Sequence, residues 1–496
     1  MTTARRTLLA AALCSAALVS ACTSDGPDGP GGSGGAPAAG LRPVAAQPVV
    51  APGRGPGALS VSTSSALFDS APAVVVAVAS DAAGVQEGTA QAERLGVPLL
   101  LQEGPPPAVD PALRAEVDRL GARDVLLVGQ ASALTDLPGS TTSADDLPDL
   151  GRAEPAQVDV LVEAGDEPGR LAAAATARAA GATVVRTAGA DPRADPAAVD
   201  ALKAGGRGVV AVGDAFGPPE RLASRVAVAA TGVQLPGGGQ VLFPGRRLVA
   251  LYGTPGSGAL GVLGEQGLEA SIARAKEVAE PYDALSDVPV VPTFEIIVTV
   301  ASASAGPDGN YSTEIAVDEL RPWVEQAGRD GVYVVLDLQP GRSDFLSQAK
   351  AYEPLLRLPH VGLALDSEWR LKPDQVHLKQ IGSVGIDEVN GVVDWLADLT
   401  ARERLPQKLL VLHQFKLSMI QDEQRLDTSR DELAVLIHMD GQGAPSLKDG
   451  TWGAVVRAAP PGVTFGWKNF YDEDEPMLTP AQTMTRRPTP VMISYQ

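Results

Sequence analysis

Two carboxyl groups separated by one residue give the sequence its clearest sign of chemistry. Asp366 and Glu368 end the apolar run 361–365, and Trp369 follows them directly. Residues i and i+2 of a strand point the same way, with α-carbons about 6.6 Å apart. Because two close carboxylates repel, one of them should hold its proton more tightly than usual. A carboxylic acid beside a carboxylate is what glycosidic cleavage requires, and Trp369 could stack on a sugar ring.

Polar residues also follow the other apolar runs of the C-terminal half. One alone could be a helix cap or a turn former, but a series of them is more than a scaffold needs. Tyr252 and Asn469 occupy such positions, and Glu295 lies slightly inside its run. The residues that we expect to contact a substrate are Asp337, His413, Gln414, His438, Asp440, Trp467, Trp369 and Tyr495.

The elements that must position these residues form a regular series. Eight apolar runs predict strands at 248–252, 293–299, 332–337, 361–366, 408–413, 433–438, 463–467 and 491–495. Helical patterns separate most of them, at 265–278, 315–327, 345–356 and 386–402. The number and size of these units predict a (β/α)8 TIM-like barrel over residues 246–496, with a doubly wound sheet as the alternative. In a barrel the carboxyl ends of the strands meet at one mouth, where the polar residues would gather.

The same residues admit other chemistry. Asp366, Glu368, His413, His438 and Asp440 include ligands suited to a divalent ion. However, no HxH or HExxH spacing is present, so we predict no metal and no other cofactor, and a metal-dependent hydrolase stays an alternative.

The G-x-G-x-x-G segment 256–261 lies too far from the next predicted helix for a dinucleotide loop. It fits a loop over the barrel mouth better.

The N-terminus predicts export and anchoring. Arg5 and Arg6 precede a short apolar stretch in residues 1–21, which is typical of a secretory signal peptide. The tetrad 19–22, Val-Ser-Ala-Cys, resembles the bacterial lipoprotein signal. That resemblance implies diacylation of Cys22, which would hold the protein on the extracytoplasmic face of the cell membrane. Residues 22–57, rich in Gly, Pro and Ala, are predicted to be a flexible linker.

Residues 58–245 predict an open α/β repeat domain. Apolar runs at 73–79, 97–101 and 124–129 alternate with helical patterns, and the order repeats at 159–162, 183–185 and 208–213. Two segments, "AERLGVPLLL" and "RLGARDVLLVG", and the repetition resemble the type 2 cell wall-binding repeat family. Its members bind anionic cell-wall polymers and usually carry three repeats, whereas two are found here. A plain α/β scaffold is the alternative.

The C-terminal half resembles a glycoside hydrolase barrel. The D-x-E that ends the fourth predicted strand is similar to that of chitinase-type and lysozyme-type families, which cleave N-acetylated glycans. This resemblance implies that Glu368 is the general acid and that Asp366 stabilises an oxazolinium-type intermediate. A degenerate barrel that only binds sugar is the alternative.

Charge and cysteine content exclude other classes. The 60 acidic and 40 basic residues give a net charge of −20, which argues against a nucleic-acid partner. The two cysteines, Cys14 and Cys22, both lie in the N-terminal segment, so no thiolate site is expected in the folded body. Together the patterns predict a lipid-anchored envelope protein that binds cell-wall glycan and could hydrolyse its glycosidic bonds.

Overall fold

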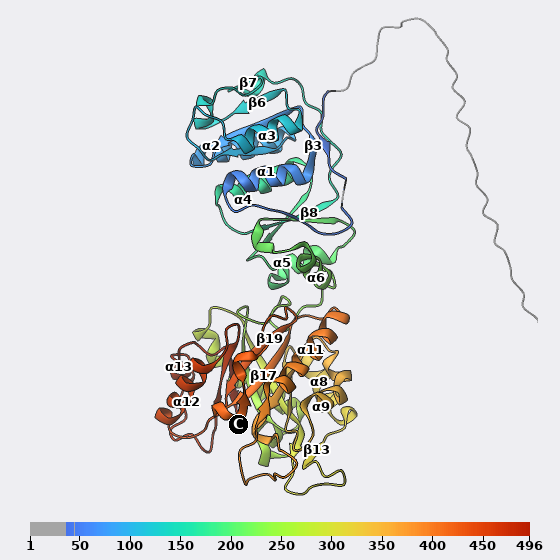
Figure 1. The fold of residues 1–496 in the computed structure, drawn as a ribbon, viewed down its shortest axis with the longest axis vertical. Helices are drawn as coiled ribbons and strands as arrows, with labels where there is room; N and C mark the ends of the chain where they lie inside the picture. Colours follow the sequence, from blue (N-terminus) through green and yellow to red (C-terminus); the bar gives the residue numbers. More distant parts are fainter. Residues whose placement is uncertain (1–35, 44) are drawn as a thin grey trace, which may run out of the picture. The chain divides into compact units, whose positions relative to one another are not determined.

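The computed structural model describes residues 36–43 and 45–496 (Figure 1). The predicted signal peptide, Cys22 and most of the predicted linker lie outside the described residues. Among the helices that are described, none combines the length and the apolar character needed to cross a membrane.

The described part of the predicted linker is not a tether, and this differs from the expectation for residues 22–57. Strand β1 (Gly40–Leu41) pairs with β3 (Phe68–Ser70), and β2 (Val49–Ala51) pairs with β10 (Gly208–Val212). Helix α1 (Pro56–Leu67) begins inside the same segment. The three apolar residues of β2 suffice for an edge strand. The prediction from composition missed this strand because Gly and Pro are frequent around it.

Two parallel sheets of four strands each lie within residues 49–229. The first has the order β5-β4-β6-β7 and the second the order β2-β10-β8-β9. Strand β4 is buried along its whole length, as its unbroken apolar sequence predicted. Besides β2 and β10, the strands are β4 (Ala73–Val78), β5 (Leu99–Gln102), β6 (Asp124–Leu127), β7 (Ser140–Thr141), β8 (Val158–Glu163) and β9 (Thr183–Thr187).

Small residues set the packing of the helices in this region. Helix α1 packs against α4 (Pro168–Ala179), which contains eight buried residues, most of them Ala. A side chain at Gly169 would bring a Cβ to within 2.8 Å of the Pro56 α-carbon, so glycine is what permits this close approach. The other helices are α2 (Ala82–Leu95), α3 (Pro111–Leu120), α5 (Pro196–Lys203) and α6 (Pro219–Ala229).

The rest of the chain forms a closed barrel of eight parallel strands, which confirms the predicted fold. Strand β11 (Arg247–Gly253) pairs on one side with β12 (Val290–Ala301) and on the other with β21 (Met492–Tyr495). This double pairing closes the sheet and excludes the doubly wound alternative. Around the barrel the remaining strands are β20 (Thr464–Asn469), β19 (Leu433–Met439), β17 (Lys408–Gln414), β15 (Val361–Asp366) and β14 (Tyr333–Leu338).

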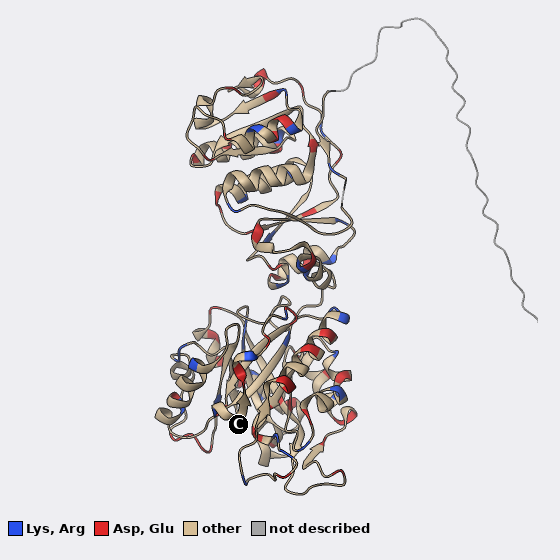
Figure 2. Ribbon diagram, viewed as in Figure 1, with Lys and Arg blue, Asp and Glu red and all other residues tan. Residues whose placement is uncertain are grey.

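Helices and short strands surround the barrel. The helices are α7 (Leu268–Ala279), α8 (Val317–Arg329), α9 (Phe345–Ala351), α10 (Glu353–Leu356), α11 (Ile386–Arg402), α12 (Pro445–Ala458) and α13 (Pro480–Thr483). Strand β13 (Ser312–Glu314) extends β12 in the antiparallel sense, and β16 (Val384–Gly385) pairs with β18 (Ile420–Gln421). Asp and Glu are spread over many of these elements (Figure 2).

Strand alternation divides the barrel's buried residues into two cores. Ala250, Val335 and Val411 belong to a cluster inside the barrel. Leu336 and Leu363 belong to a larger cluster that also holds residues of the helices. Because successive side chains of a strand point to opposite faces, each strand contributes to both cores. The inward positions nearest the carboxyl ends of the strands are the ones that carry polar residues.

Candidate active site

A layer of buried polar side chains lies above the apolar interior of the barrel. Its members lie at or near the carboxyl ends of barrel strands, except for Glu295 in the middle of β12. Their exposed fractions are 2% or less, so water does not solvate them. Buried polar groups must therefore bond to one another. The layer consists of Tyr252, Glu295, Asp337, Asp366, His413, His438, Lys468 and Ser494.

His413 lies between two carboxylates. Its Nε2 is 2.8 Å from Glu295 Oε1, and its Nδ1 is 2.8 Å from Asp440 Oδ2. Since carboxylates only accept hydrogen bonds, both ring nitrogens must donate, and the ring is an imidazolium. Burial opposes this charge, but Glu295 and Asp440 outweigh it and raise the pKa of His413 well above its usual value. In return, His413 lowers the pKa of Glu295 against the effect of burial.

Lys468 supplies a second cation next to Asp440. Its Nζ is 3.1 Å from Asp440 Oδ1 and 3.4 Å from the centroid of the Tyr252 ring. Against burial, Lys468 and His413 hold the pKa of Asp440 well below its usual range. Asp440 likewise raises the pKa of Lys468 against burial. An ammonium held in this way is no nucleophile, so Schiff-base chemistry is a poor fit to this barrel.

Three further carboxyl groups hold their protons tightly. Burial raises the pKa of Glu368 to about 7, with help from the charge of Asp440. Burial also raises the pKa of Asp337 to about 6, although the Tyr252 hydroxyl donates to its Oδ2 at 2.8 Å. The pKa of Asp366 is raised well above its usual value by burial and by its carboxylate neighbours. The mouth thus combines an ionised carboxylate with carboxylic acids.

A pocket of about 340 Å³ opens over this layer. Asp366, Glu368, Asp440 and Lys468 line it together with Trp369. The volume is in the range of small-molecule sites.

The glycine-rich segment 256–261 contributes to the wall of the same pocket. Its residues Ala259 and Leu260 lie on the wall, and two short 3₁₀ turns follow β11 before α7 begins at Leu268. This is the arrangement expected of a loop at the mouth, and it lacks the tight strand-to-helix turn of a dinucleotide site.

The structure brings most of the expected residues together. Asp366, Glu368, Trp369 and Asp440 line the pocket, and Asp337, His413 and His438 lie in the layer of buried polar side chains. The Nε2 of His438 forms a hydrogen bond of 2.9 Å with Ser494 Oγ, and burial lowers the pKa of His438 to about 4. His438 is therefore neutral, and its ring centroid lies 5.3 Å from that of His413.

Three expected substrate contacts lie elsewhere, and this corrects the prediction. Trp467 is fully buried in a cluster with Met439, Trp452 and Leu478. The Tyr495 hydroxyl is 2.6 Å from that of Tyr282, and Gln414 donates to Glu423. None of the three lines the pocket. Strand alternation is the reason, because their neighbours Lys468, Ser494 and His413 take the inward positions.

The sequence reading missed Lys468, Gln339 and Ser494. Gln339 lines the pocket, and its Nε2 is 3.4 Å from the Tyr252 hydroxyl. Strand alternation could have identified Lys468, because Gly466 and Lys468 point to the same face of their strand. The predicted strand 463–467 ended one residue before Lys468. Tyr252, at a strand end, and Glu295, slightly inside its strand, are visible in the sequence but were not among the expected site residues.

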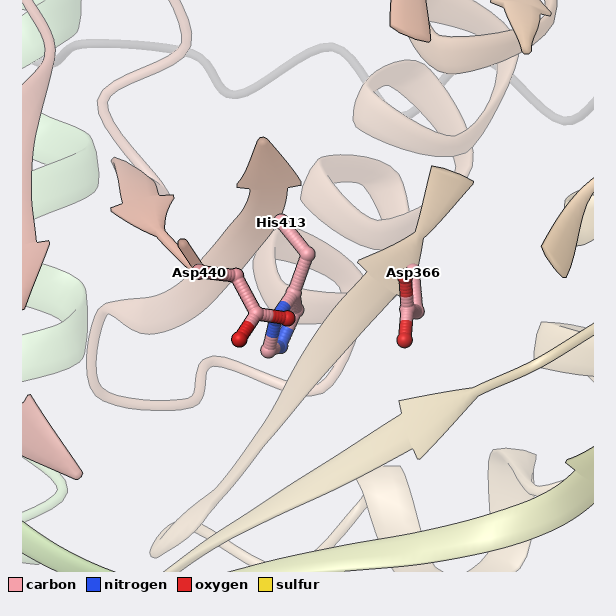
Figure 3. Close-up of side chains that lie close together, drawn as sticks. All are labelled: Asp366, His413 and Asp440. Carbon is pink, nitrogen blue, oxygen red and sulfur yellow. The ribbon is translucent and has the colours of Figure 1, made fainter. Parts of the chain in front are cut away.

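A metal ion has a candidate ligand set here but an unfavourable setting. Asp366, His413 and Asp440 each offer one ligand atom, and these atoms lie within 4.8 Å of one another (Figure 3). Both nitrogens of His413 already pair with carboxylates, and the Lys468 ammonium lies against Asp440. A divalent ion would need a neutral His413 and would repel Lys468. These residues therefore fit a metal poorly.

Comparisons with known proteins leave the family open. No protein-family model matches the chain, and no curated protein matches it. Among solved structures, Cwp6 from Clostridium difficile matches with a TM-score of 0.30 and 10% sequence identity. The match covers 61% of this chain and 62% of that chain. A TM-score this low supports no inference about fold or function, so the proposed function rests on the site itself.

Proposed function

We propose that this protein is a cell-envelope glycoside hydrolase in which Glu368 is the general acid. The observation that carries the proposal is the contrast between two carboxyl groups of one pocket. The pKa of Glu368 is raised to about 7, whereas that of Asp440 is held well below its usual range. The mechanism needs one carboxyl group that keeps its proton and a neighbouring one that is ionised. This requires that their surroundings move the two pKa values apart.

In this mechanism Glu368 protonates the oxygen that leaves. The bond between the anomeric carbon and that oxygen breaks, its electron pair goes to the oxygen, and the proton of Glu368 binds there. Water adds its hydroxyl to the anomeric carbon, and its remaining proton restores the acid. The positive charge that develops on the sugar is stabilised by the Asp440 carboxylate.

This gives Asp366 a role different from the one implied by resemblance. A carboxyl group that keeps its proton stabilises a cation poorly, and the pKa of Asp366 is raised well above its usual value. Its Oδ1 accepts a hydrogen bond from the backbone N–H of Glu368 at 3.2 Å. We therefore propose that Asp366 positions the general acid through this hydrogen bond, while Asp440 carries the negative charge.

The site of action follows from the sequence. The signal-like N-terminus and Cys22 support anchoring to the membrane, and the two repeated α/β sheets are compatible with the proposed binding of cell-wall polymer. Under this proposal the barrel acts on glycan that the N-terminal region holds nearby.

The test is hydrolysis by the full chain of a panel of envelope and N-acetylated polysaccharides, beside Glu368→Gln. Cleavage should fall by about a hundredfold or more in this variant, while binding is kept. Glu473→Gln is the matched control, because Glu473 is an exposed carboxyl on the wall of the same pocket. Binding without cleavage by the unaltered protein would contradict the proposal and favour a non-catalytic module.

The second candidate, a metal-dependent hydrolase, rests on the cluster of Asp366, His413 and Asp440. It predicts loss of cleavage in a chelator and recovery on addition of Zn²⁺ or Mn²⁺. The carboxylate mechanism predicts the same rate in the presence and absence of chelator.

A further inference from the structure

A second pocket of about 240 Å³ adjoins the first. Both pockets are lined by Glu368 and Trp369, so these two residues form the wall between them. His377 and Lys379 line the second pocket only. The proposed general acid thus lies at the boundary of two spaces, each able to hold part of a ligand.

The loop that forms the second pocket is held in place by specific contacts. His377 Nε2 donates to the Tyr311 carbonyl at 2.9 Å, and the His377 ring meets the Trp369 ring edge-on at 5.2 Å. The Arg342 guanidinium lies 4.5 Å from the Tyr311 ring centroid and donates to the carbonyl of Gln375. The pocket is therefore built on ordered contacts between two loops.

Leu378 marks the rim of this pocket with a strained conformation. Its φ is +62°, a value that leucine rarely adopts, and the residue is 85% exposed. Strained residues persist only where the surrounding structure holds them, and they concentrate at functional sites.

We propose that the second pocket binds the leaving-group sugar and that Lys379 recognises an acidic substituent on that sugar. This inference rests on the proposed function. The ionised Asp440 lines only the first pocket, so the sugar that becomes positively charged belongs there. An acid at the boundary of the pockets can reach the oxygen that links the two sugars. Lys379 is a long, exposed cation suited to a carboxylate or phosphate group.

The test compares neutral and acidic substrates of the full chain. Fully N-acetylated chitin oligosaccharides are neutral, whereas hyaluronan oligosaccharides and peptide-free peptidoglycan strands carry carboxylates. In Lys379→Ala, kcat/KM for the acidic substrates should fall about tenfold, roughly the value of one charge-assisted hydrogen bond, and the neutral rate should not change. Lys379→Arg should restore the acidic rate, and Lys372→Ala, an exposed lysine of the same loop, should leave both rates unchanged.

Binding separates failure of this inference from failure of the proposed function. If the unaltered protein cleaves none of the substrates, the proposed function is wrong, and tryptophan fluorescence titration with the same oligosaccharides still tests the pocket. Tighter binding of acidic than of neutral oligosaccharides, lost in Lys379→Ala, would support the inference. Equal losses for both kinds of oligosaccharide, or none, would overturn it.

Discussion

Glu368 and Asp440 line one pocket, and their surroundings move their pKa values in opposite directions. Glu368 is poorly solvated and forms no ion pair with any cation that the structure describes, whereas Asp440 pairs with both His413 and Lys468. The cations therefore determine which carboxyl ionises. This difference is the basis on which we propose Glu368 as the acid and Asp440 as its charged partner.

The first prediction concerns the pH dependence of cleavage. Because the pKa of Glu368 is about 7, kcat/KM should fall as the pH rises through 7 and the acid loses its proton. Asp440 stays ionised at lower pH, so no matching loss is expected between about pH 4 and 6. Rates measured across this range for the full chain and for Glu473→Gln should coincide in shape. A rate that stays constant above pH 8 would contradict the role of Glu368.

The second prediction concerns Lys468. Lys468→Met removes a cation from Asp440, so the pKa of Asp440 should rise and a loss of activity on the acidic side of the profile should appear. Tyr252→Phe keeps the ring beneath Lys468 but removes the hydroxyl that bonds Asp337, and it should not create that acidic limb. An unchanged profile in Lys468→Met would show that Asp440 does not act as the charged partner.

The third prediction concerns stability. The pKa of Glu368 is raised on folding from 4.5 to about 7, so its contribution to stability is present below 4.5 and is lost as the pH rises to 7. Glu368→Gln should therefore stabilise the fold at pH 8 by up to about 3 kcal/mol, and hardly at pH 4. Urea unfolding at both pH values measures the difference. Destabilisation at pH 8 would mean that the carboxylate is favourably paired in the folded protein.

The fourth prediction concerns closure of the barrel. Strand β21 pairs with β11 and β20, and its Met492 lies in the core inside the barrel. A chain ending at Thr489 loses both ladders and exposes two sheet edges, so it should fail to fold. Circular dichroism and solubility of the shortened chain test this. A soluble, cooperatively unfolding product would contradict the closure.

Much of this architecture could be predicted from the sequence because its causes are local. Most barrel strands contain a continuous apolar run, and a polar residue at its end is visible by inspection, as with Asp366 and His413. Strand alternation, applied strictly, would also have selected Lys468 and rejected Trp467.

The partnerships within the site could not be predicted, because they depend on the register between strands far apart in sequence. The β15–β17 register places Asp366 opposite His413, and the closure of the barrel brings Glu295 within 2.8 Å of the same ring. These contacts decide which carboxyl is ionised, and they were not visible when the resemblance implied that Asp366 is the charged partner. The structure favours Asp440.

The most direct test of the role of Glu368 compares substrates whose leaving groups depend to different degrees on protonation. Two aryl glycosides of the same sugar, one with a strongly acidic phenol and one with a weakly acidic phenol, are compared in the full chain and in Glu368→Gln. An acidic phenol leaves without protonation, so the variant should lose less than about tenfold on it and about a hundredfold or more on the other. Equal losses on both substrates would show that Glu368 is not the general acid.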